Sequence, residues 1–515
     1  MTRLECHRSK IEKEQNTMQR RQFLGTVAAA SVASSALSNR SEGKETMDWD
    51  YIIVGAGTAG LPAAIFASRR GAKVLLIDAA ESVGGTLHLA NGQVSAGGSR
   101  TQAKKGIIDS PDAHYEDVMR ITGGLADENV VRKTCDEAPD TINWLLDNGL
   151  TPLAEHPVTG SDPGRPTYTT ARYIWGKNEG RDILAAVLKE LEPELESGRV
   201  VTQLETEVTE LVMSDSGAVK GVRARSAEGM HTFKGRHTLI TTGGYAMNPE
   251  VFENLVGQPA YGAGSYPSNL GKGLELATSA GGMLRGHELH RAGTGSVLTA
   301  DTFPATPYAR FDTNPLTRPP WEIWVNNDGQ RFIREDEPMS ETRASALVKQ
   351  DKFRYAVVFD DQILRTAPSG FPRWSDEEYR AHFNDNPMFI KAGTLEELAE
   401  KAGIDAGGLA KTVAMYNESV ASGSDDLGRE YMPRTISTGP YYAVIHLGSS
   451  ATSSVGIIVD KDMRVLRKDG SVVPNLYATG EVLGSGATLG SVFAPGMMLT
   501  PALALGRWLG MTLEI

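Results

Sequence analysis

Hydrophobic residues gather in short runs early in the chain, and two of these runs predict buried strands. The sequence turns apolar at Asp50-Tyr51-Ile52-Ile53-Val54, a run that is typical of a strand covered on both faces. Lys73-Val74-Leu75-Leu76-Ile77 has the same character. The Ala-rich stretch between them predicts a helix. The order of strand, helix and strand indicates a βαβ unit.

A glycine-rich turn joins the first predicted strand to the helix. Val54 leads directly into Gly55-Ala56-Gly57-Thr58-Ala59-Gly60, a GxGxxG motif in the context that a dinucleotide requires. One glycine permits the tight bend, one lets the pyrophosphate approach the backbone, and one lets helix and strand pack closely. Asp78 ends the second strand, where an acidic group would bind the adenosine ribose hydroxyls; a helix N-cap or turn is the alternative. The unit predicts bound FAD or NAD.

A further apolar run lies ahead of this unit and predicts a targeting segment. Arg20-Arg21-Gln22-Phe23-Leu24 opens an Ala-rich run that reaches Leu37, and polar residues follow. This pattern is typical of a twin-arginine signal, with Met18 as the expected start, and it predicts a periplasmic or exported protein. A cytoplasmic protein with a chance Arg-Arg in a disordered tail is the alternative. The run is too short for a membrane span.

Composition and charge narrow the class of protein. The chain has 515 residues, of which 40% are hydrophobic and 23% charged, an ordinary globular mix for two or three packed units. A net charge of -12 argues against nucleic acid or an anionic membrane and favours small-molecule substrates or protein partners. Cys6 falls in the leader, so the mature chain forms no internal disulfide, and Cys135 is expected to be buried packing.

The sequence beyond Asp78 resembles a known family. It continues with Gly84-Gly85-Thr86-Leu87-His88-Leu89-Ala90 and then Asp109-Ser110-Pro111. These segments resemble the soluble fumarate reductase flavoproteins, a family that includes urocanate reductase and the 3-ketosteroid dehydrogenases. The resemblance extends over nearly the whole mature chain. Its other segments are residues 102–105, 241–245, 326–332, 439–443 and 476–482.

This resemblance implies FAD rather than NAD. It places Glu481 on the ribityl or ribose hydroxyls, with a surface turn residue as the alternative, and it places the backbone near Gly496 and Met497 at the flavin pyrimidine end. Since the sequence lacks a second GxGxxG for NAD(P)H, electrons must come from the substrate, a protein carrier or a quinone-like acceptor. The cofactor contacts expected elsewhere are Gly55, Gly57, Ala59, Gly60, Asp78, Gly85, Thr86 and Gly243.

The flavin is expected to be held without a covalent bond. Membrane-bound relatives attach FAD to a histidine that would fall near Thr86, whereas His88 lies two residues further along and is expected to be a core or surface histidine. Ser485-Gly486-Ala487-Thr488 is similar to an FMN attachment site. The sequence before it departs from that motif, however, and it lies inside the FAD segment.

The resemblance also implies the fold and its division. It implies an α/β protein in which a Rossmann-like FAD-binding domain carries an inserted α+β capping domain. The expected parts are a leader over residues 1–46, the first part of the FAD-binding domain over 47–286, the capping or substrate domain over 287–435, and the second part of the FAD-binding domain over 436–515.

Two arginines are the candidate catalytic residues. Family enzymes pass a hydride between flavin N5 and one carbon of a C=C or CH–CH bond, while a side chain handles a proton at the neighbouring carbon. In the fumarate reductases an arginine in a Thr-Arg motif serves as the acid, and Arg343 matches it here. Arg318 falls where a second, proton-relaying arginine would be. Because the reference pKa of arginine is high, this role requires a buried, polarised site.

Both assignments have a structural alternative. Arg343 could begin a helix and pair with Glu341 or Glu337. Arg318 lies in a Pro-rich loop that could align differently.

Three expected dicarboxylate contacts are missing. In a count without gaps, the two substrate-binding histidines of the fumarate reductases fall at Gly293 and Thr452, and the carboxylate-binding arginine falls at Phe493. Without these side chains, the desolvation of two substrate carboxylates is poorly compensated. The sequence therefore predicts that fumarate is not the substrate.

The segment around Phe493 looks closer to the ketosteroid dehydrogenases, in which a tyrosine and a glycine amide polarise a ketone. Gly496 is kept, but Val492 and Phe493 occupy the neighbourhood of the tyrosine. The candidates to supply that hydroxyl are Tyr245, Tyr308 and Tyr442, and core packing is the alternative for each. Three histidines near the cap or flavin are expected to be ordinary hydrogen-bonded side chains, and these are His287, His290 and His446.

Together these features predict an FAD-dependent oxidoreductase acting on a CH–CH or C=C bond next to a carbonyl or carboxylate, with a separate electron donor or acceptor. Its substrate is expected to be bulkier or less charged than fumarate. The alternatives are a 3-ketosteroid-type dehydrogenase, a different flavin oxidation such as that of an alcohol or amine, and a non-catalytic flavin electron-transfer subunit.

Overall fold

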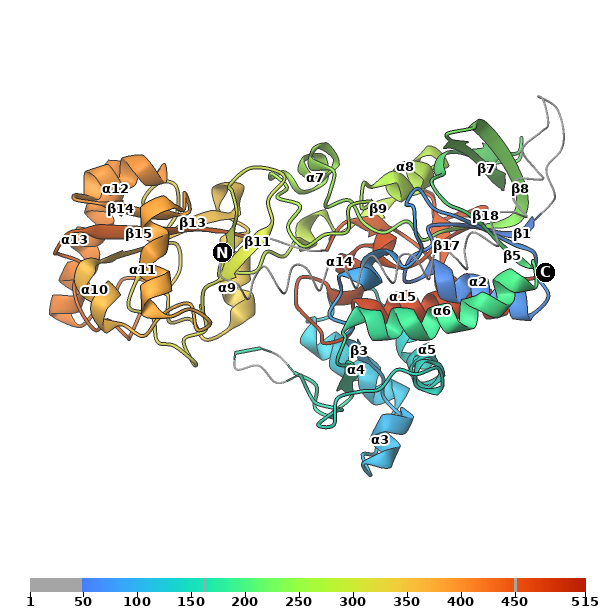
Figure 1. Ribbon diagram of the computed structural model, residues 1–515, viewed down its shortest axis with the longest axis horizontal. Helices are drawn as coiled ribbons and strands as arrows, with labels where there is room; N and C mark the ends of the chain where they lie inside the picture. Colours follow the sequence, from blue (N-terminus) through green and yellow to red (C-terminus); the bar gives the residue numbers. More distant parts are fainter. Residues whose placement is uncertain (1–48, 161–163, 166, 449–451) are drawn as a thin grey trace, which may run out of the picture.

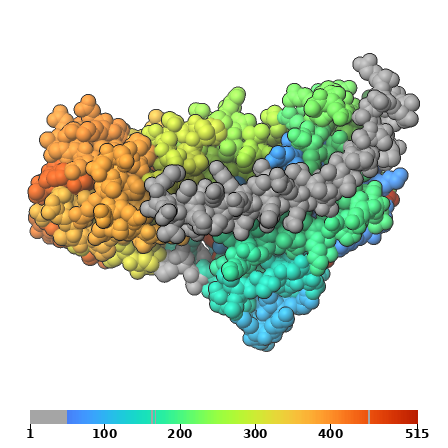
Figure 2. Space-filling model, viewed as in Figure 1, coloured from blue at the N-terminus to red at the C-terminus, as the bar shows by residue number. Residues whose placement is uncertain are grey.

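The computed structural model describes residues 49–160, 164–165, 167–448 and 452–515. These residues form two lobes (Figure 1). The space-filling view shows the same outline, with the segment near residue 400 in orange at one end (Figure 2). The predicted twin-arginine leader, with Cys6 and Met18, lies outside the described residues.

A mixed sheet forms the centre of the larger lobe. Strands β1 (Trp49–Val54) and β2 (Val74–Ile77) run parallel, with Tyr51 opposite Val74 and Val54 opposite Ile77. The predicted βαβ unit is therefore present, since helix α2 (Gly60–Arg69) joins the two strands. The order in the sheet is β17-β18-β8-β1-β2-β5, and a hairpin of β6 and β7 extends from β8. The other strands of this sheet are β5 (Val200–Gln203), β6 (Glu207–Met213), β7 (Val219–Ser226), β8 (Gly229–Ile240), β17 (Arg464–Leu466) and β18 (Val472–Ala478).

The last helix of the chain packs on the first helix of the βαβ unit (Figure 1). In α15 (Leu499–Thr512), a Cβ on Gly506 would lie 2.1 Å from the Ala59 carbonyl oxygen, so the two backbones are in direct contact. The remaining elements of this lobe are β3 (Val94–Ser95), α3 (Arg100–Lys104), α4 (Pro111–Ile121), α5 (Glu128–Asp147), β4 (Tyr173–Ile174), α6 (Gly180–Glu196), α7 (Pro249–Val256), α8 (Lys272–Ser279) and α14 (Ser485–Leu489).

A separate antiparallel sheet forms the smaller lobe, and helices cover it (Figure 1). Its order is β12-β13-β15-β14, and every residue of β13 (Arg354–Asp360) is buried. This α+β lobe and the run of parallel strands in the mixed sheet of the larger lobe, β18-β8-β1-β2-β5, confirm the predicted fold class. The other elements of this lobe and of the hairpin beside it are β10 (Ser296–Leu298), β11 (Pro307–Arg310), β12 (Ile323–Val325), α9 (Ser340–Leu347), α10 (Asp361–Thr366), α11 (Asp376–Asp385), β14 (Phe389–Ala392), α12 (Leu395–Ala402), α13 (Ala406–Ser422) and β15 (Tyr441–Leu447).

The chain returns to the larger lobe later than the sequence predicts. Strand β15 begins beyond the expected boundary at residue 436, yet it pairs with β13 over its full length, from Tyr441 opposite Asp360 to Leu447 opposite Arg354. Hydrogen bonding therefore assigns β15 to the smaller sheet. The outgoing strand β9 (Leu284–Arg285) and the returning strand β16 (Gly456–Ile457) pair with each other, so the two crossings lie side by side.

One remaining expectation concerns packing among the described residues. Cys135 is buried, as predicted for packing, and burial raises the pKa of its thiol. Among these residues, no helix has the length and apolar character to cross a bilayer. The same part of the chain contains no cluster of His, Cys, Asp and Glu that would hold a metal.

A buried ion-pair network ties the α3–α4 region to β4. The guanidinium of Arg172 lies 2.8 Å from Asp109 and 2.6 Å from Asp117, and all three side chains are almost fully buried. Burial alone would raise the pKa of Asp117, but hydrogen bonds from Arg120, Thr169 and Arg172 lower it to about 2. Burial would also raise the pKa of Asp109, but hydrogen bonds from Arg172 and Gln102 lower it, so both carboxylates are charged at neutral pH and depend on Arg172.

We expect Arg172→Leu to lower the free energy of unfolding by about 3–5 kcal/mol, because it leaves buried carboxylates without their counter-ion. Urea denaturation followed by circular dichroism measures this loss. Arg223→Leu is the control, since it removes an ion pair with Glu210 in which both side chains are more than half exposed. Equal effects of the two variants would contradict the expectation.

Candidate functional site

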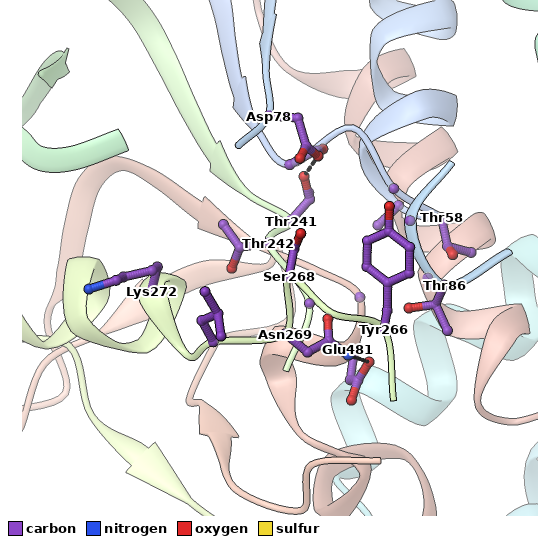
Figure 3. A pocket seen from close by; sticks show the side chains of 18 of the residues that line it. Thr58, Asp78, Thr86, Thr241, Thr242, Tyr266, Ser268, Asn269, Lys272 and Glu481 are labelled. Carbon is purple, nitrogen blue, oxygen red and sulfur yellow. Dashed lines mark hydrogen bonds between the residues drawn. The ribbon is translucent and has the colours of Figure 1, made fainter. Parts of the chain in front are cut away.

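A cavity of about 880 Å³ opens at the carboxyl ends of the parallel strands. This is the edge of an open α/β sheet at which ligands bind. Figure 3 shows its walls, which come from segments far apart in the sequence. The residues contributed at or just beyond the strand ends are Val54 and Gly55 from β1, Ile77 and Asp78 from β2, Thr241 and Thr242 following β8, and Gly480 and Glu481 following β18.

The three glycines of the GxGxxG turn have different surroundings. Gly55 has φ +111°, and a Cβ there would lie 2.4 Å from the Thr241 carbonyl oxygen. A Cβ on Gly60 would lie 1.9 Å from the Gly55 carbonyl oxygen, so the helix could not approach the turn as closely. A Cβ on Gly57 would meet only Gly85, at 3.8 Å, and would otherwise project into free space beside the cavity. Gly57 therefore leaves room for a ligand, whereas Gly55 and Gly60 permit backbone packing.

Asp78 lines the cavity and holds the glycine turn. Its carboxylate accepts hydrogen bonds from the backbone N–H of Ala56, at 2.6 Å, and of Ala80, at 2.8 Å. Burial raises the pKa of Asp78, and these two hydrogen bonds oppose the shift. A carboxylate has about four acceptor sites, so acceptor capacity remains for a ribose hydroxyl.

Glu481 lies across the cavity from Asp78 (Figure 3). Its carboxylate accepts hydrogen bonds from the Ser453 backbone N–H, at 3.1 Å, and from the Asn269 side chain, at 3.4 Å. Burial raises the pKa of Glu481, and these bonds oppose the shift. Gly243 belongs to the same cluster, because a Cβ there would lie 2.4 Å from the Asn269 side-chain oxygen. These contacts differ from those of an exposed turn residue.

The other expected cofactor residues divide between the cavity wall and the interior. Ala59, Gly85, Thr86 and Gly496 line the cavity. Gly60 lies behind the wall, in the packing between helix and turn described above. Met497 is fully buried in a small apolar cluster with Val118 and Cys135, while the next residue, Met498, lines the cavity. His88 is not in the lining, and its Nε2 lies 3.0 Å from the Val83 carbonyl oxygen.

One wall of the cavity was not foreseen from the sequence. It is formed by the segment between α7 and α8, in which Tyr266, Ser268 and Asn269 face the cavity (Figure 3). The only local signal is a run of turn-forming residues, Gly264-Ser265-Tyr266-Pro267-Ser268, ahead of a helix. Such a run predicts a loop, but not the ligand that the loop contacts.

Two positions with missing dicarboxylate contacts lie at the cavity. Thr452 and Phe493 both line it. The guanidinium of Arg165 lies 5.8 Å from the centre of the Phe493 ring. Gly293 is outside the lining, and no heavy atom of the described residues lies within 4 Å of a Cβ built there. An aromatic ring therefore stands at the position that was counted as the carboxylate-binding arginine.

Arg343 lies near the start of α9 and is almost fully buried. It donates hydrogen bonds from Nη1 to the carbonyl oxygens of Glu337 and Pro338, and its Nε has no partner among the described residues. The Glu341 carboxylate pairs with Arg291 instead, at 2.9 Å. Burial lowers the pKa of Arg343. The alternative in which Arg343 pairs with a carboxylate of Glu341 or Glu337 therefore does not describe this structure.

The start of α9 contacts the larger lobe. The backbone N–H of Ser340 donates to the Gly164 carbonyl oxygen at 2.9 Å, and a Cβ on Gly164 would lie 1.9 Å from the Pro338 carbonyl oxygen. Arg343 does not itself line the cavity. These contacts place α9 where the two lobes meet.

Arg318, unlike Arg343, pairs with a carboxylate. Its guanidinium makes a bidentate pair with Glu322, at 2.5 and 3.0 Å, and Nε donates to the Pro368 carbonyl oxygen. Burial would lower the pKa of Arg318, but Glu322 raises it above the usual value. The structure does not bring Arg318 into the cavity lining. Its pairing favours the structural alternative.

The tyrosines and histidines that were considered as substrate contacts lie elsewhere, and none lines the cavity. The Tyr245 hydroxyl accepts a hydrogen bond from the Val455 backbone, and the Tyr442 hydroxyl donates to Asp361. Tyr308 is 43% exposed. The histidine environments are a contact of His287 with the Leu255 carbonyl oxygen, stacking of His290 on Phe353 and stacking of His446 on Tyr355.

Comparison with known proteins identifies the family. Residues 50–490 match the family described as FAD binding domain. The fumarate reductase (cytochrome) of Shewanella frigidimarina is 27% identical over 469 residues, which cover 90% of this chain and 76% of that protein. The urocanate reductase of Eggerthella lenta is 27% identical over 511 residues, which cover 95% and 80% of the two chains.

Solved structures agree with this assignment. The open conformation of a flavocytochrome c3 fumarate reductase superposes with a TM-score of 0.65 at 25% identity, covering 96% of this chain and 80% of that one. The 3-ketosteroid delta1-dehydrogenase of Sterolibacterium denitrificans has a TM-score of 0.67 at 20% identity, covering 90% and 99%, and supports the fold.

The residues that line the cavity fit FAD independently of these comparisons. Gly57 leaves the wall open beside the start of α2, where phosphates bind, and Asp78 and Glu481 place two carboxylates on its sides. The hydroxyl of Thr242, which also lines the cavity, is buried without a hydrogen-bond partner among the described residues, so it has capacity for a ligand. FAD, rather than NAD, is thus the cofactor, as predicted. The chain belongs to the FAD binding domain family and is an FAD-dependent oxidoreductase.

Proposed function

We propose that the protein reduces or forms a C=C bond next to a carbonyl or carboxylate, with Arg343 giving or taking the proton. FAD supplies the acceptor or donor of the hydride at its N5 atom. The relatives support this reaction class, since they include a fumarate reductase, a urocanate reductase and the vinyl phenol reductase of Lactiplantibacillus plantarum. A separate electron donor or acceptor is part of the proposal, and so is export by the twin-arginine route.

The environment of Arg343 carries the proposal. A buried guanidinium normally pairs with a carboxylate, because burying an isolated charge is costly. Within the described residues Arg343 has only carbonyl partners, and burial lowers its pKa. A lowered pKa brings the guanidinium closer to the range in which it can exchange a proton with substrate. Its place in α9, where the lobes meet, is suited to a substrate bound between them.

Arg318 has a weaker claim to the chemistry. The bidentate bond with Glu322 stabilises its charged form and raises its pKa. A role as proton relay would require Glu322 to exchange the proton. The proposal therefore gives the proton transfer at the substrate to Arg343 and a structural role to Arg318.

The proposed substrate carries less charge than fumarate. Phe493 and Thr452 line the cavity in place of the charged contacts that were expected there. An aromatic ring offers apolar contact, and it cannot compensate a desolvated carboxylate. The ring does fit a flat or bulky unsaturated carbonyl compound.

We expect Arg343→Gln to lower the rate of flavin reoxidation by substrate by about 100-fold or more, because proton transfer by a positioned group contributes roughly that factor. Anaerobic stopped-flow absorbance of the reduced enzyme measures this rate. Arg365→Gln is the control, since Arg365 is 65% exposed and pairs with Asp361 on the surface of the smaller lobe. Wild-type rates in Arg343→Gln, with FAD still bound, would remove Arg343 from the mechanism.

For the substrate, we expect an anaerobic panel of enones, mono-enoates and ketosteroids to contain compounds that reoxidise the reduced flavin, and fumarate to show no saturation. Saturated partners are tested in parallel against the oxidised enzyme, because the proposal leaves the direction open. Saturable reduction of fumarate would contradict the substrate class. A panel without any flavin response would favour an electron-transfer subunit instead.

The proposal also includes FAD held without a covalent bond. We expect acid denaturation to release the flavin into solution, and Gly57→Val to abolish FAD binding while the fold is kept, because the new side chain would fill the space beside the start of α2. Flavin absorbance after gel filtration and circular dichroism are the measurements. Gly407→Val, on the exposed side of α13, is the matched control. Flavin that stays with the denatured chain would show a covalent bond.

A further inference from the structure

A buried polar cluster lies directly behind the cavity wall at Gly496. The Tyr168 hydroxyl donates to the Pro495 carbonyl oxygen at 2.5 Å. The Ser95 hydroxyl lies 3.2 Å from both the Tyr168 hydroxyl and His114 Nε2, and His114 Nε2 lies 3.3 Å from the Tyr168 hydroxyl. All three side chains of this cluster are almost fully buried. The cluster has no part in the proton transfer assigned to Arg343.

The cluster is neutral at ordinary pH. Burial raises the pKa of Tyr168 far above its usual value, so the hydroxyl keeps its proton. Burial lowers the pKa of His114 to about 3, so the imidazole carries one proton. His114 Nδ1 has no hydrogen-bond partner among the described residues. The proton is therefore assigned to Nε2, where the N–H has hydroxyl acceptors. A proton on Nδ1 would leave a buried N–H without an acceptor, which is more costly.

This assignment gives the hydrogen bonds a direction. His114 Nε2 donates into the hydroxyls of Ser95 and Tyr168, and the Tyr168 hydroxyl donates onward to the Pro495 carbonyl oxygen. Hydrogen bonds in such a chain polarise one another in a low-dielectric interior. The chain ends on one peptide group at the cavity.

That peptide group has a free donor on its other side. The Pro495 carbonyl and the Gly496 N–H belong to the same peptide bond. The Gly496 N–H has no hydrogen-bond partner among the described residues, and Gly496 lines the cavity. A Cβ on Gly496, where φ is +80°, would lie 2.6 Å from the Ser95 backbone nitrogen, so the turn is pressed against β3. A donor bound to the carbonyl oxygen makes the N–H of the same peptide a stronger donor.

We propose that Tyr168 is a positioning residue for the flavin. It orients and polarises the Pro495–Gly496 peptide, so that the Gly496 N–H stabilises the negative charge that the pyrimidine end of FAD gains on reduction. The inference rests on the FAD chemistry of the proposed function and on the placement of the flavin pyrimidine end near Gly496 that the family resemblance implies, and it is independent of substrate and of Arg343. Tyr168 thereby favours the reduced cofactor.

The test is the flavin midpoint potential of Tyr168→Phe, which keeps the ring and removes the donor. We expect the equilibrium between the flavin and a two-electron redox dye to shift about tenfold toward oxidised flavin, which equals a potential lower by about 30 mV. Tyr173→Phe is the matched control, since Tyr173 is buried in the adjacent strand β4 and its hydroxyl has no hydrogen-bond partner among the described residues. This variant is expected to keep the wild-type potential.

A second change works in the opposite direction without removing a contact. Incorporation of 3-fluorotyrosine at position 168 makes the hydroxyl a stronger donor, and we expect it to raise the potential. The potential of the fluorinated protein also tests the inference if Tyr168→Phe fails to retain FAD. Equal potentials for Tyr168→Phe and Tyr173→Phe, or no effect of fluorination, would overturn the inference. No substrate enters either measurement, so a failure here is distinct from a failure of the proposed reaction.

Discussion

The close approach of backbones around the glycine turn is the constraint on which the rest of the site depends. The Thr241 hydroxyl, at the end of β8, bonds the carbonyl oxygens of Val54 and Gly55 at 3.0 and 2.7 Å. Gly60 starts α2 against that same turn, and Gly506 packs α15 against Ala59. Three segments that are distant in the sequence thus meet within a few ångströms. Side chains at these positions would separate them and would displace both carboxylates of the cofactor site.

Features that are local in the sequence could be predicted, and features that depend on distant contacts could not. The turn, the two strands and Asp78 lie within about thirty residues, where hydrophobic pattern and glycine spacing specify the structure. The sequence placed strand β15 in the wrong lobe. Its partner β13 lies far away in the chain, and a run of apolar residues does not indicate which strand it pairs with. The wall around Asn269 was missed for the same reason, since only its contact with Glu481 marks it as functional.

The two candidate arginines show that the surroundings of a side chain, and not its residue type alone, determine what it can do. The family resemblance makes both Arg318 and Arg343 candidates for the proton chemistry, and both are buried. Their partners separate them: Glu322 neutralises Arg318 and raises its pKa, whereas Arg343 has carbonyl oxygens and a lowered pKa. A guanidinium that pairs with a carboxylate is stabilised in its charged form, which suits a structural role. A charge that lacks such a partner remains available to a substrate.

The same contrast applies to α9 and to the cavity wall at Gly496. Where the two lobes meet, Arg343 is a buried charge with carbonyl partners, and Phe493 and Thr452 line the cavity. Behind Gly496, a chain of neutral side chains ends on a peptide group, and the nearby Arg172 guanidinium, 4.8 Å from the centre of the Tyr168 ring, is paired with carboxylates. A neutral chain avoids the desolvation cost of a buried ion while it still directs a dipole at the cofactor. In the proposed reaction, Arg343 handles the proton, while hydrogen-bond dipoles at Gly496 favour the reduced flavin.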